Sequence, residues 1–148
     1  MTVIELKSFD RKNIILFCYV LAFTIVNFAL YYFTLESGLF SGVAEILVLF
    51  LYPSGAFLYG YVTCDGIRSF FAGILSYASF ILTVMLVTSI LNDFKELNYL
   101  FLFVGYHLIL LLFIGLIGFF ASKRQRFSYI ASCILAGLWF LVFFAGIT

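Results

Sequence analysis

Charged residues are scarce in this sequence. Only 10% of its 148 residues are Asp, Glu, Lys or Arg, whereas 66% are hydrophobic; an average soluble domain has about 25% charged residues. A water-soluble surface cannot be built from this composition. The eight Lys and Arg residues are dispersed among short loops and the formal net charge is +1, so we expect no nucleic-acid partner.

Residue types that carry catalysis are equally few. A single histidine, His107, excludes a bis-histidine haem or iron site within one chain, and no Asp lies in an apolar run, which excludes a pair of intramembrane aspartates. The zinc motif HExxH, the nucleophile elbow GxSxG and the phosphate loop GxxxxGK[ST] are missing. Cys18, Cys64 and Cys133 lack metal-ligand spacing, and we interpret them as small hydrophobic residues. We expect a protein that is not an enzyme and that uses no metal or cofactor.

Long apolar runs make up most of the chain. A window of about 20 apolar residues crosses the roughly 30 Å hydrocarbon layer of a bilayer. Five such windows predict an all-α integral membrane protein with one domain, residues 1–148, and a single bundle of transmembrane helices at about 13–35, 42–63, 70–91, 100–121 and 129–147. The first run, of about 23 residues, is too long for a signal-peptide core and is expected to stay as a helix.

Basic residues in the short loops predict the orientation, because Lys and Arg favour the cytoplasmic side. With the N-terminus in the cytoplasm and the C-terminus outside, Lys95 alone lies outside, and seven basic residues lie inside: Lys7, Arg11, Lys12, Arg68, Lys123, Arg124 and Arg126. We expect a multi-pass protein of the plasma membrane if the source is prokaryotic.

The only proline, Pro53, lies inside the second apolar run. If this segment dipped into the bilayer and returned, every later helix would be reversed and Arg68 would face outward, so we predict that the segment crosses. Proline clashes with the carbonyl four residues earlier, that of Leu49, so we predict a helix kink. The hydroxyl of Ser54 is expected to bond a nearby carbonyl of its own helix.

Small residues predict how this helix packs. Helices in lipid associate through close contact at small residues and through hydrogen bonds. Ala56 and Gly60 are expected to pack against the third helix, where Ala72 and Ser76 lie. We expect Gly66 to permit the chain reversal between the two helices.

Polar residues deep in the spans are candidates for a binding site. A rise of 1.5 Å per residue places Asn27, Thr83 and His107 about 20 to 21 Å above the inner surface. Glu45, the only carboxylate within a span, lies at about 27 Å. An ionisable residue in a membrane is a functional candidate because its insertion is costly. Two uses stay open: an outward-opening polar pocket with the Pro53 kink at its floor, or packing hydrogen bonds, with Glu45 reaching interfacial water.

Lys123, Arg124 and Arg126 form a basic cluster beside the predicted cytoplasmic surface. Attraction to anionic lipid is about 1 kcal/mol per basic residue, so these residues are candidate headgroup contacts. Their effect on topology is a sufficient alternative explanation. Asp65 and Arg68, in the preceding inner turn, are expected to form a structural pair or to contact headgroups.

Two functions remain. The first is a non-enzymatic accessory or scaffold protein whose helices pack against membrane partners, either other membrane protein subunits or further copies of itself, within the lipid bilayer. The alternative is a small transporter or channel component that uses Asn27, Glu45, Thr83 and His107. An enzyme acting on lipid has the least support.

Overall fold

The computed structural model describes the backbone of residues 3–37, 41–91 and 97–145 and the side chains of residues 11–30, 46–86 and 105–145. Within these ranges the chain forms no strand and five α-helices: α1 (Val3–Ser37), α2 (Ser41–Thr63), α3 (Gly66–Leu91), α4 (Leu97–Ser122) and α5 (Arg126–Ala145). Each helix contains a segment of 18 to 21 residues that is long and apolar enough to cross a membrane. The predicted all-α class with five candidate spans is confirmed.

Several helices begin earlier than the apolar runs suggest. α1 begins at Val3 instead of residue 13, and α3 begins at Gly66 instead of residue 70. The early start of α3 has a local cause: Asp65 is its N-cap, because its Oδ1 accepts a hydrogen bond from the backbone N–H of Arg68 at 3.2 Å. Polar residues therefore predict where an apolar segment ends, but not where the helix ends. A helix extends to the point where its terminal N–H and C=O groups form hydrogen bonds with other groups.

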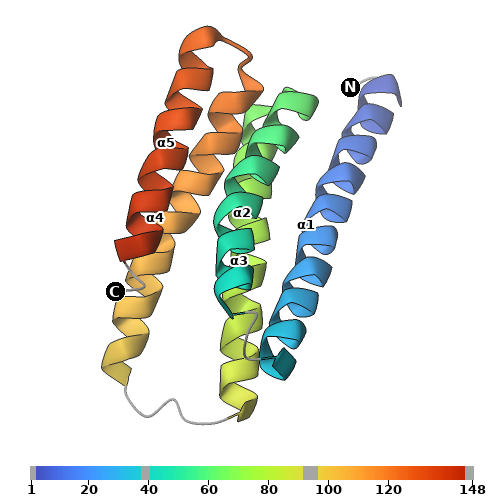
Figure 1. The fold of residues 1–148 in the computed structure, drawn as a ribbon. Coiled ribbons are helices and arrows are strands. Elements are labelled where there is room, and N and C mark those ends of the chain that lie inside the picture. Colours follow the sequence, from blue (N-terminus) through green and yellow to red (C-terminus); the bar gives the residue numbers. More distant parts are fainter. Residues whose placement is uncertain (1–2, 38–40, 92–96, 146–148) are drawn as a thin grey trace.

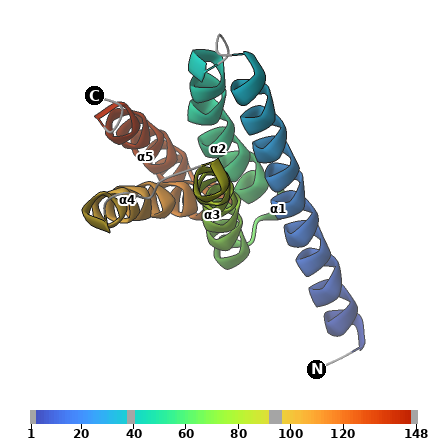
Figure 2. The same ribbon diagram turned by 90° about the horizontal axis from the view of Figure 1, so that it is seen from below.

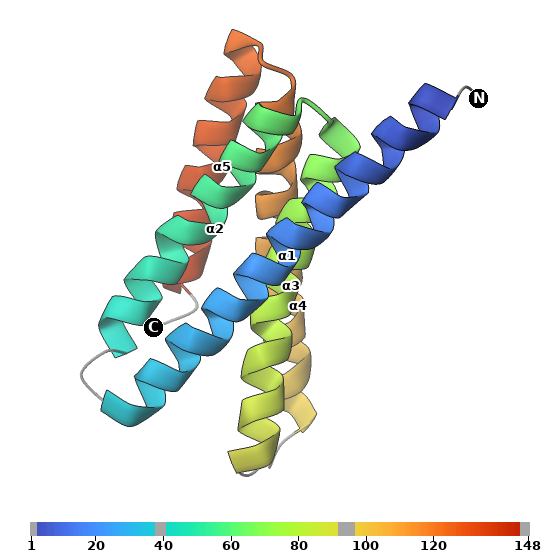
Figure 3. The same cartoon turned by 90° about the vertical axis from the view of Figure 1, so that its right-hand side faces the viewer.

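The helices are arranged around α4. α4 packs against α2, α3 and α5, while α1 packs mainly against α3. α1 and α5 consequently lie at opposite edges of the bundle (Figure 2). α1 runs obliquely across α3, and its N-terminal turns extend beyond the other helices (Figure 3). The start of α1, the α2–α3 turn and the α4–α5 turn lie at the same end of the molecule (Figure 1).

Gly118 of α4 is the point where three backbones meet. A Cβ atom on Gly118 would lie 2.6 Å from the carbonyl oxygen of Ser69 in α3 and 3.2 Å from that of Ala56 in α2. A Cβ on Gly60 of α2 would lie only 2.2 Å from the carbonyl oxygen of Gly118. Only glycine permits backbones to approach so closely.

The expected packing partner of Ala56 and Gly60 is corrected by this contact. Both residues closely approach α4 at Gly118, while α2 also packs against α3 as expected. α3 in turn approaches α4, since a Cβ on Gly73 would lie 2.7 Å from the carbonyl oxygen of Ile114. Two helices come closest where neither carries a side chain, and Gly60 opposite Gly118 meets that condition better than Ala72 or Ser76 does.

Pro53 lies within an uninterrupted α2. The hydroxyl of Ser54 donates a hydrogen bond to the carbonyl oxygen of Phe50 at 2.6 Å, which confirms the expected bond back to its own helix. The kink at Pro53 stays a prediction.

The chain reversal between α2 and α3 corrects a second expectation. The residue with the left-handed backbone conformation is Cys64, with φ of 52°, and not Gly66. Cys64 directly follows the last residue of α2, the position where a helix commonly ends in this conformation. Gly66 lies close to α4 instead: a Cβ there would lie 3.0 Å from the Phe119 ring, which would have to shift slightly to admit it.

Substitution of Gly118 by alanine tests the central contact. Gly118→Ala should push α4 away from α2 and α3 and destabilise the bundle by about 1 to 3 kcal/mol, as overpacking does. Gly105→Ala, in the same helix, is the matched control because nothing lies within 4 Å of a Cβ at that position. Thermal unfolding in one mild detergent measures both. Equal melting temperatures for the two variants would contradict the contact.

Candidate functional site

Asn27 joins three helices. Its side chain on α1 is 2% exposed. Its Nδ2 donates a hydrogen bond to Ser79 Oγ of α3 at 2.8 Å, and its Oδ1 accepts one from the hydroxyl of Tyr52 of α2. Both ends of the amide are thus bonded to neighbouring helices, a favourable arrangement where no water is present.

Thr83 and His107 belong to the same cluster. Thr83 donates to the carbonyl oxygen of Ser79 at 2.8 Å, one turn earlier in α3. His107 Nδ1, on α4, lies 2.8 Å from the hydroxyl of Tyr77 on α3. The rings of Tyr77 and Tyr52 are in edge contact, with centroids 5.1 Å apart.

Three of the four predicted pocket residues are therefore connected, but through tyrosines. α1 and α4 do not pack against each other in the described part of the chain, and the contact between Tyr52 and Tyr77 is one link between Asn27 and His107. The side chain of Glu45 lies outside the described residues. A pocket formed by these four residues stays a prediction.

Two deep aromatic residues end without a hydrogen bond. The hydroxyl of Tyr19 and Nε1 of Trp139 are buried and have no hydrogen-bond partner. Trp139 instead packs its ring against Phe143, with centroids 5.0 Å apart. The hydroxyls of Tyr52 and Tyr77, by contrast, each meet a polar side chain, that of Asn27 and that of His107.

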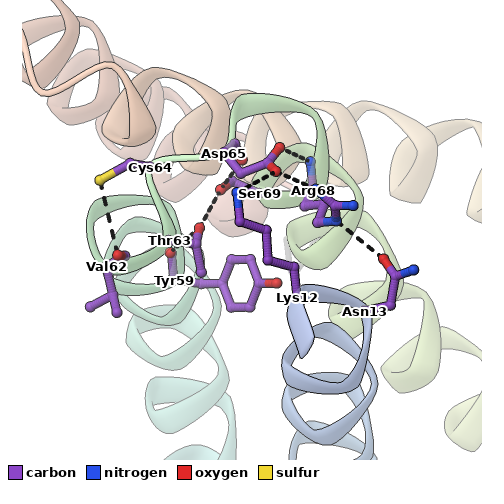
Figure 4. A network of polar contacts seen from close by, with 9 residues as sticks. All are labelled: Lys12, Asn13, Tyr59, Val62, Thr63, Cys64, Asp65, Arg68 and Ser69. Carbon is purple, nitrogen blue, oxygen red and sulfur yellow. Dashed lines mark hydrogen bonds and ion pairs between the residues drawn. The ribbon is translucent and has the colours of Figure 1, made fainter. Parts of the chain in front are cut away.

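A cleft of about 300 Å³ lies at the end of the bundle where α1 passes the α2–α3 turn. Figure 4 shows the polar network beside it. α1, α2, the turn and α3 all contribute to its lining, which consists of Arg11, Lys12, Ile15, Tyr59, Val62, Thr63, Asp65 and Arg68.

Asp65 is the centre of this network. Its carboxylate accepts hydrogen bonds from the backbone N–H of Arg68 at 3.2 Å and from the Arg68 guanidinium, and Lys12 Nζ lies 3.7 Å from its Oδ2. Burial acts to raise the pKa of Asp65, but the hydrogen bonds and positive charge of Arg68, together with the charge of Lys12, outweigh burial and lower the pKa below its ordinary value. The carboxylate is therefore charged at neutral pH.

Arg68 ties the turn to α1. Its Nε donates to Asn13 Oδ1 at 3.2 Å, while its guanidinium holds Asp65. On the other side of the turn, the hydroxyls of Thr63 and Ser69 lie 3.2 Å apart, and Ser69 Oγ donates to the carbonyl oxygen of Asp65 at 2.6 Å. The expected structural pairing of Asp65 with Arg68 is present, and it includes α1 as well.

The basic cluster of the α4–α5 turn has contacts of its own. Arg124 donates two hydrogen bonds to the carbonyl oxygen of Tyr61, from Nε at 3.1 Å and from Nη2 at 2.7 Å, and its guanidinium lies 4.8 Å from the Tyr61 ring centroid. Lys123 lies over the Phe119 ring. Arg124 therefore bonds one of the last carbonyls of α2 and joins the two turns. Headgroup contacts of Lys123, Arg124 and Arg126 stay a prediction.

The sequence alone did not identify Arg11, Lys12 and Tyr59 as neighbours in a cleft. Basic-residue counting predicts that Arg11, Lys12 and Arg68 lie on one side of the membrane. Their convergence depends on α1 packing against α3, which no local pattern indicates.

Comparison with known proteins gives no match: no protein-family model matches the chain, and no curated protein or solved structure is significantly similar to it.

Neutralising Asp65 tests the network through its pH dependence. Because the folded-state pKa of Asp65 is lowered, its stabilising contribution is present above the ordinary value of 3.8 and is lost as the pH falls through the lower folded value. Asp65→Asn should therefore melt at a lower temperature than the natural chain at pH 7, and the difference should shrink as the pH falls below 3.8 and vanish only below the lowered folded-state pKa. Thermal unfolding in a non-ionic detergent measures it. A difference that persists at low pH would contradict this role of the charge.

Proposed function

We propose that this protein is a non-enzymatic accessory or scaffold protein that crosses the membrane five times and binds a further transmembrane helix along α5. Its N-terminus, the α2–α3 turn and the α4–α5 turn lie in the cytoplasm, and its C-terminus lies outside. In a prokaryotic source the membrane is the plasma membrane.

The orientation is supported by where the cations lie. The N-terminal part of α1, the α2–α3 turn and the α4–α5 turn lie at one end of the bundle (Figure 1). The described basic residues belong to these segments or to the helix turns beside them: Arg11, Lys12, Arg68, Lys123, Arg124 and Arg126. Basic residues near span ends are retained on the cytoplasmic side. An odd number of crossings then places the C-terminus outside.

The state of the deep polar groups favours a scaffold over a transporter. Asn27 uses both ends of its amide within the bundle, Thr83 bonds its own helix, and His107 bonds Tyr77. A transport site needs polar groups that face its solute, whereas Asn27 and His107 bond neighbouring helices and Thr83 bonds a carbonyl of its own helix.

Gly137 is the observation that carries the proposal. At six described glycines of α2, α3 and α4, an added Cβ would lie within 3.1 Å of another atom. These glycines are Gly55, Gly60, Gly66, Gly73, Gly115 and Gly118. Nothing lies within 4 Å of a Cβ on Gly137 in α5. Gly105 of α4 is equally open, but at the other six described helical glycines a neighbouring part of the chain uses the space, and Gly137 is the open glycine on α5, which packs mainly against α4.

The surroundings of Gly137 fit a helix partner. α5 packs against α4 and only slightly against α2, so much of its surface is available. Cys133, one turn before Gly137, is exposed and small. Two small residues four positions apart on an exposed face permit close approach of another transmembrane helix.

Gly137→Leu should abolish the association, because the added side chain fills the space that the partner helix needs. The affected species is a second copy of this chain or a copurifying membrane protein, detected by native mass spectrometry after mild detergent extraction. We expect affinity to fall at least about tenfold, which corresponds to about 1.4 kcal/mol. Ala22→Leu is the matched control, since it places the same leucine side chain on the exposed surface of α1.

Two results would contradict the proposal. One is a natural chain that is strictly monomeric and has no copurifying protein. The other is an association that survives Gly137→Leu unchanged.

A further inference from the structure

We propose that the cleft between α1 and the α2–α3 turn binds the phosphate group of an anionic phospholipid of the cytoplasmic leaflet. The inference concerns a different surface from α5, so it can hold or fail independently of the partner helix.

The charge balance of the cleft favours an anion. Among its described lining residues, Arg11, Lys12 and Arg68 are the cations and Asp65 is the only carboxylate, so three positive charges face one negative charge there. The guanidinium of Arg68 is the cation closest to the Asp65 carboxylate. Nζ of Lys12 is more distant and lies 3.7 Å from Oδ2 of Asp65. Arg11 is exposed and makes no hydrogen bond or ion pair with a described side chain. After Asp65 is neutralised by one of its partners, an excess of two positive charges remains among the described lining residues, and arginine and lysine are the residues that bind phosphate best.

The walls of the cleft favour a lipid over a soluble phosphate. Below the charged residues lie Ile15, one turn along α1 from Arg11, and Val62 of α2. These side chains are 43% and 71% exposed. A headgroup phosphate held between Arg11 and Lys12 would place its acyl chains along this apolar surface, whereas a soluble phosphate would leave it uncovered.

The cleft also lies at the level in the membrane that a lipid phosphate would occupy. Arg11 begins the first candidate span, and Thr63 and Gly66 lie at the ends of the second and third. The cleft therefore opens at the headgroup layer, beside the ends of the spans. The fixed pairing of Asp65 with Arg68 and of Arg68 with Asn13 holds the wall of the cleft in place before a lipid arrives.

Native mass spectrometry of the purified full-length chain tests the site, with phosphatidylglycerol and phosphatidylcholine as competing probes. We expect the natural chain to retain phosphatidylglycerol in preference to phosphatidylcholine. The double variant Arg11→Gln/Lys12→Gln should weaken phosphatidylglycerol binding about thirtyfold and Arg11→Gln alone about fivefold. Lys123→Gln/Arg126→Gln removes two candidate headgroup contacts from the same end of the bundle but outside the cleft, and it should weaken phosphatidylglycerol binding clearly less than Arg11→Gln/Lys12→Gln does.

Several outcomes would overturn the inference. Equal weakening in both double variants would show a diffuse attraction to the whole basic end. Equal retention of the two lipids would show that the anionic headgroup is not selected. Displacement of the lipid by millimolar glycerol phosphate would identify a soluble phosphate as the ligand instead. Melting temperatures of all variants, measured in parallel, establish that each remains folded.

Discussion

The backbones of α2, α3 and α4 touch at Gly118, and the rest of the structure is arranged around that contact. Lipid tails are as apolar as leucine, so burial of apolar surface does little to bring two helices together in a bilayer. Close backbone contact and hydrogen bonds take its place. Gly60 and Gly73 provide the first kind of interaction with α4, and α1 and α5 are added at the edges of this three-helix core.

Hydrogen bonds supply the second kind of interaction, and they attach α1. Asn27 connects α1 to α2 and α3 in the middle of the bundle, and Asn13 connects it to Arg68 at the basic end. α1 otherwise buries little: only 6% of the residues in its apolar segment are buried. Two polar contacts at different heights therefore fix the oblique helix that forms one wall of the proposed lipid cleft.

Hydropathy predicts the five candidate spans because crossing lipid requires about 20 apolar residues, a demand that every span must meet by itself. The positions of basic residues predict which residues share an end of the bundle, because each Lys or Arg near the end of a span favours the cytoplasmic side by itself. Helix pairing was not predictable in the same way. Ala56 and Gly60 offer a small face, but the sequence does not say that Gly118 meets it. The acceptor for Arg124 was also hidden, because it is the backbone carbonyl of Tyr61 and every residue has such a group.

The account depends most on the basic end of the bundle facing the cytoplasm, and the natural cysteines permit a direct measurement. Cys64 is exposed and lies between the second and third apolar segments, whereas Cys18 and Cys133 lie within segments. Because maleimides react with the thiolate, which forms in water, a membrane-impermeant maleimide should label Cys64 alone. We predict no labelling in cells with an intact plasma membrane, labelling after permeabilisation, and none in Cys64→Ser. Equal labelling of Cys64 before and after permeabilisation would place the basic end outside and contradict the account.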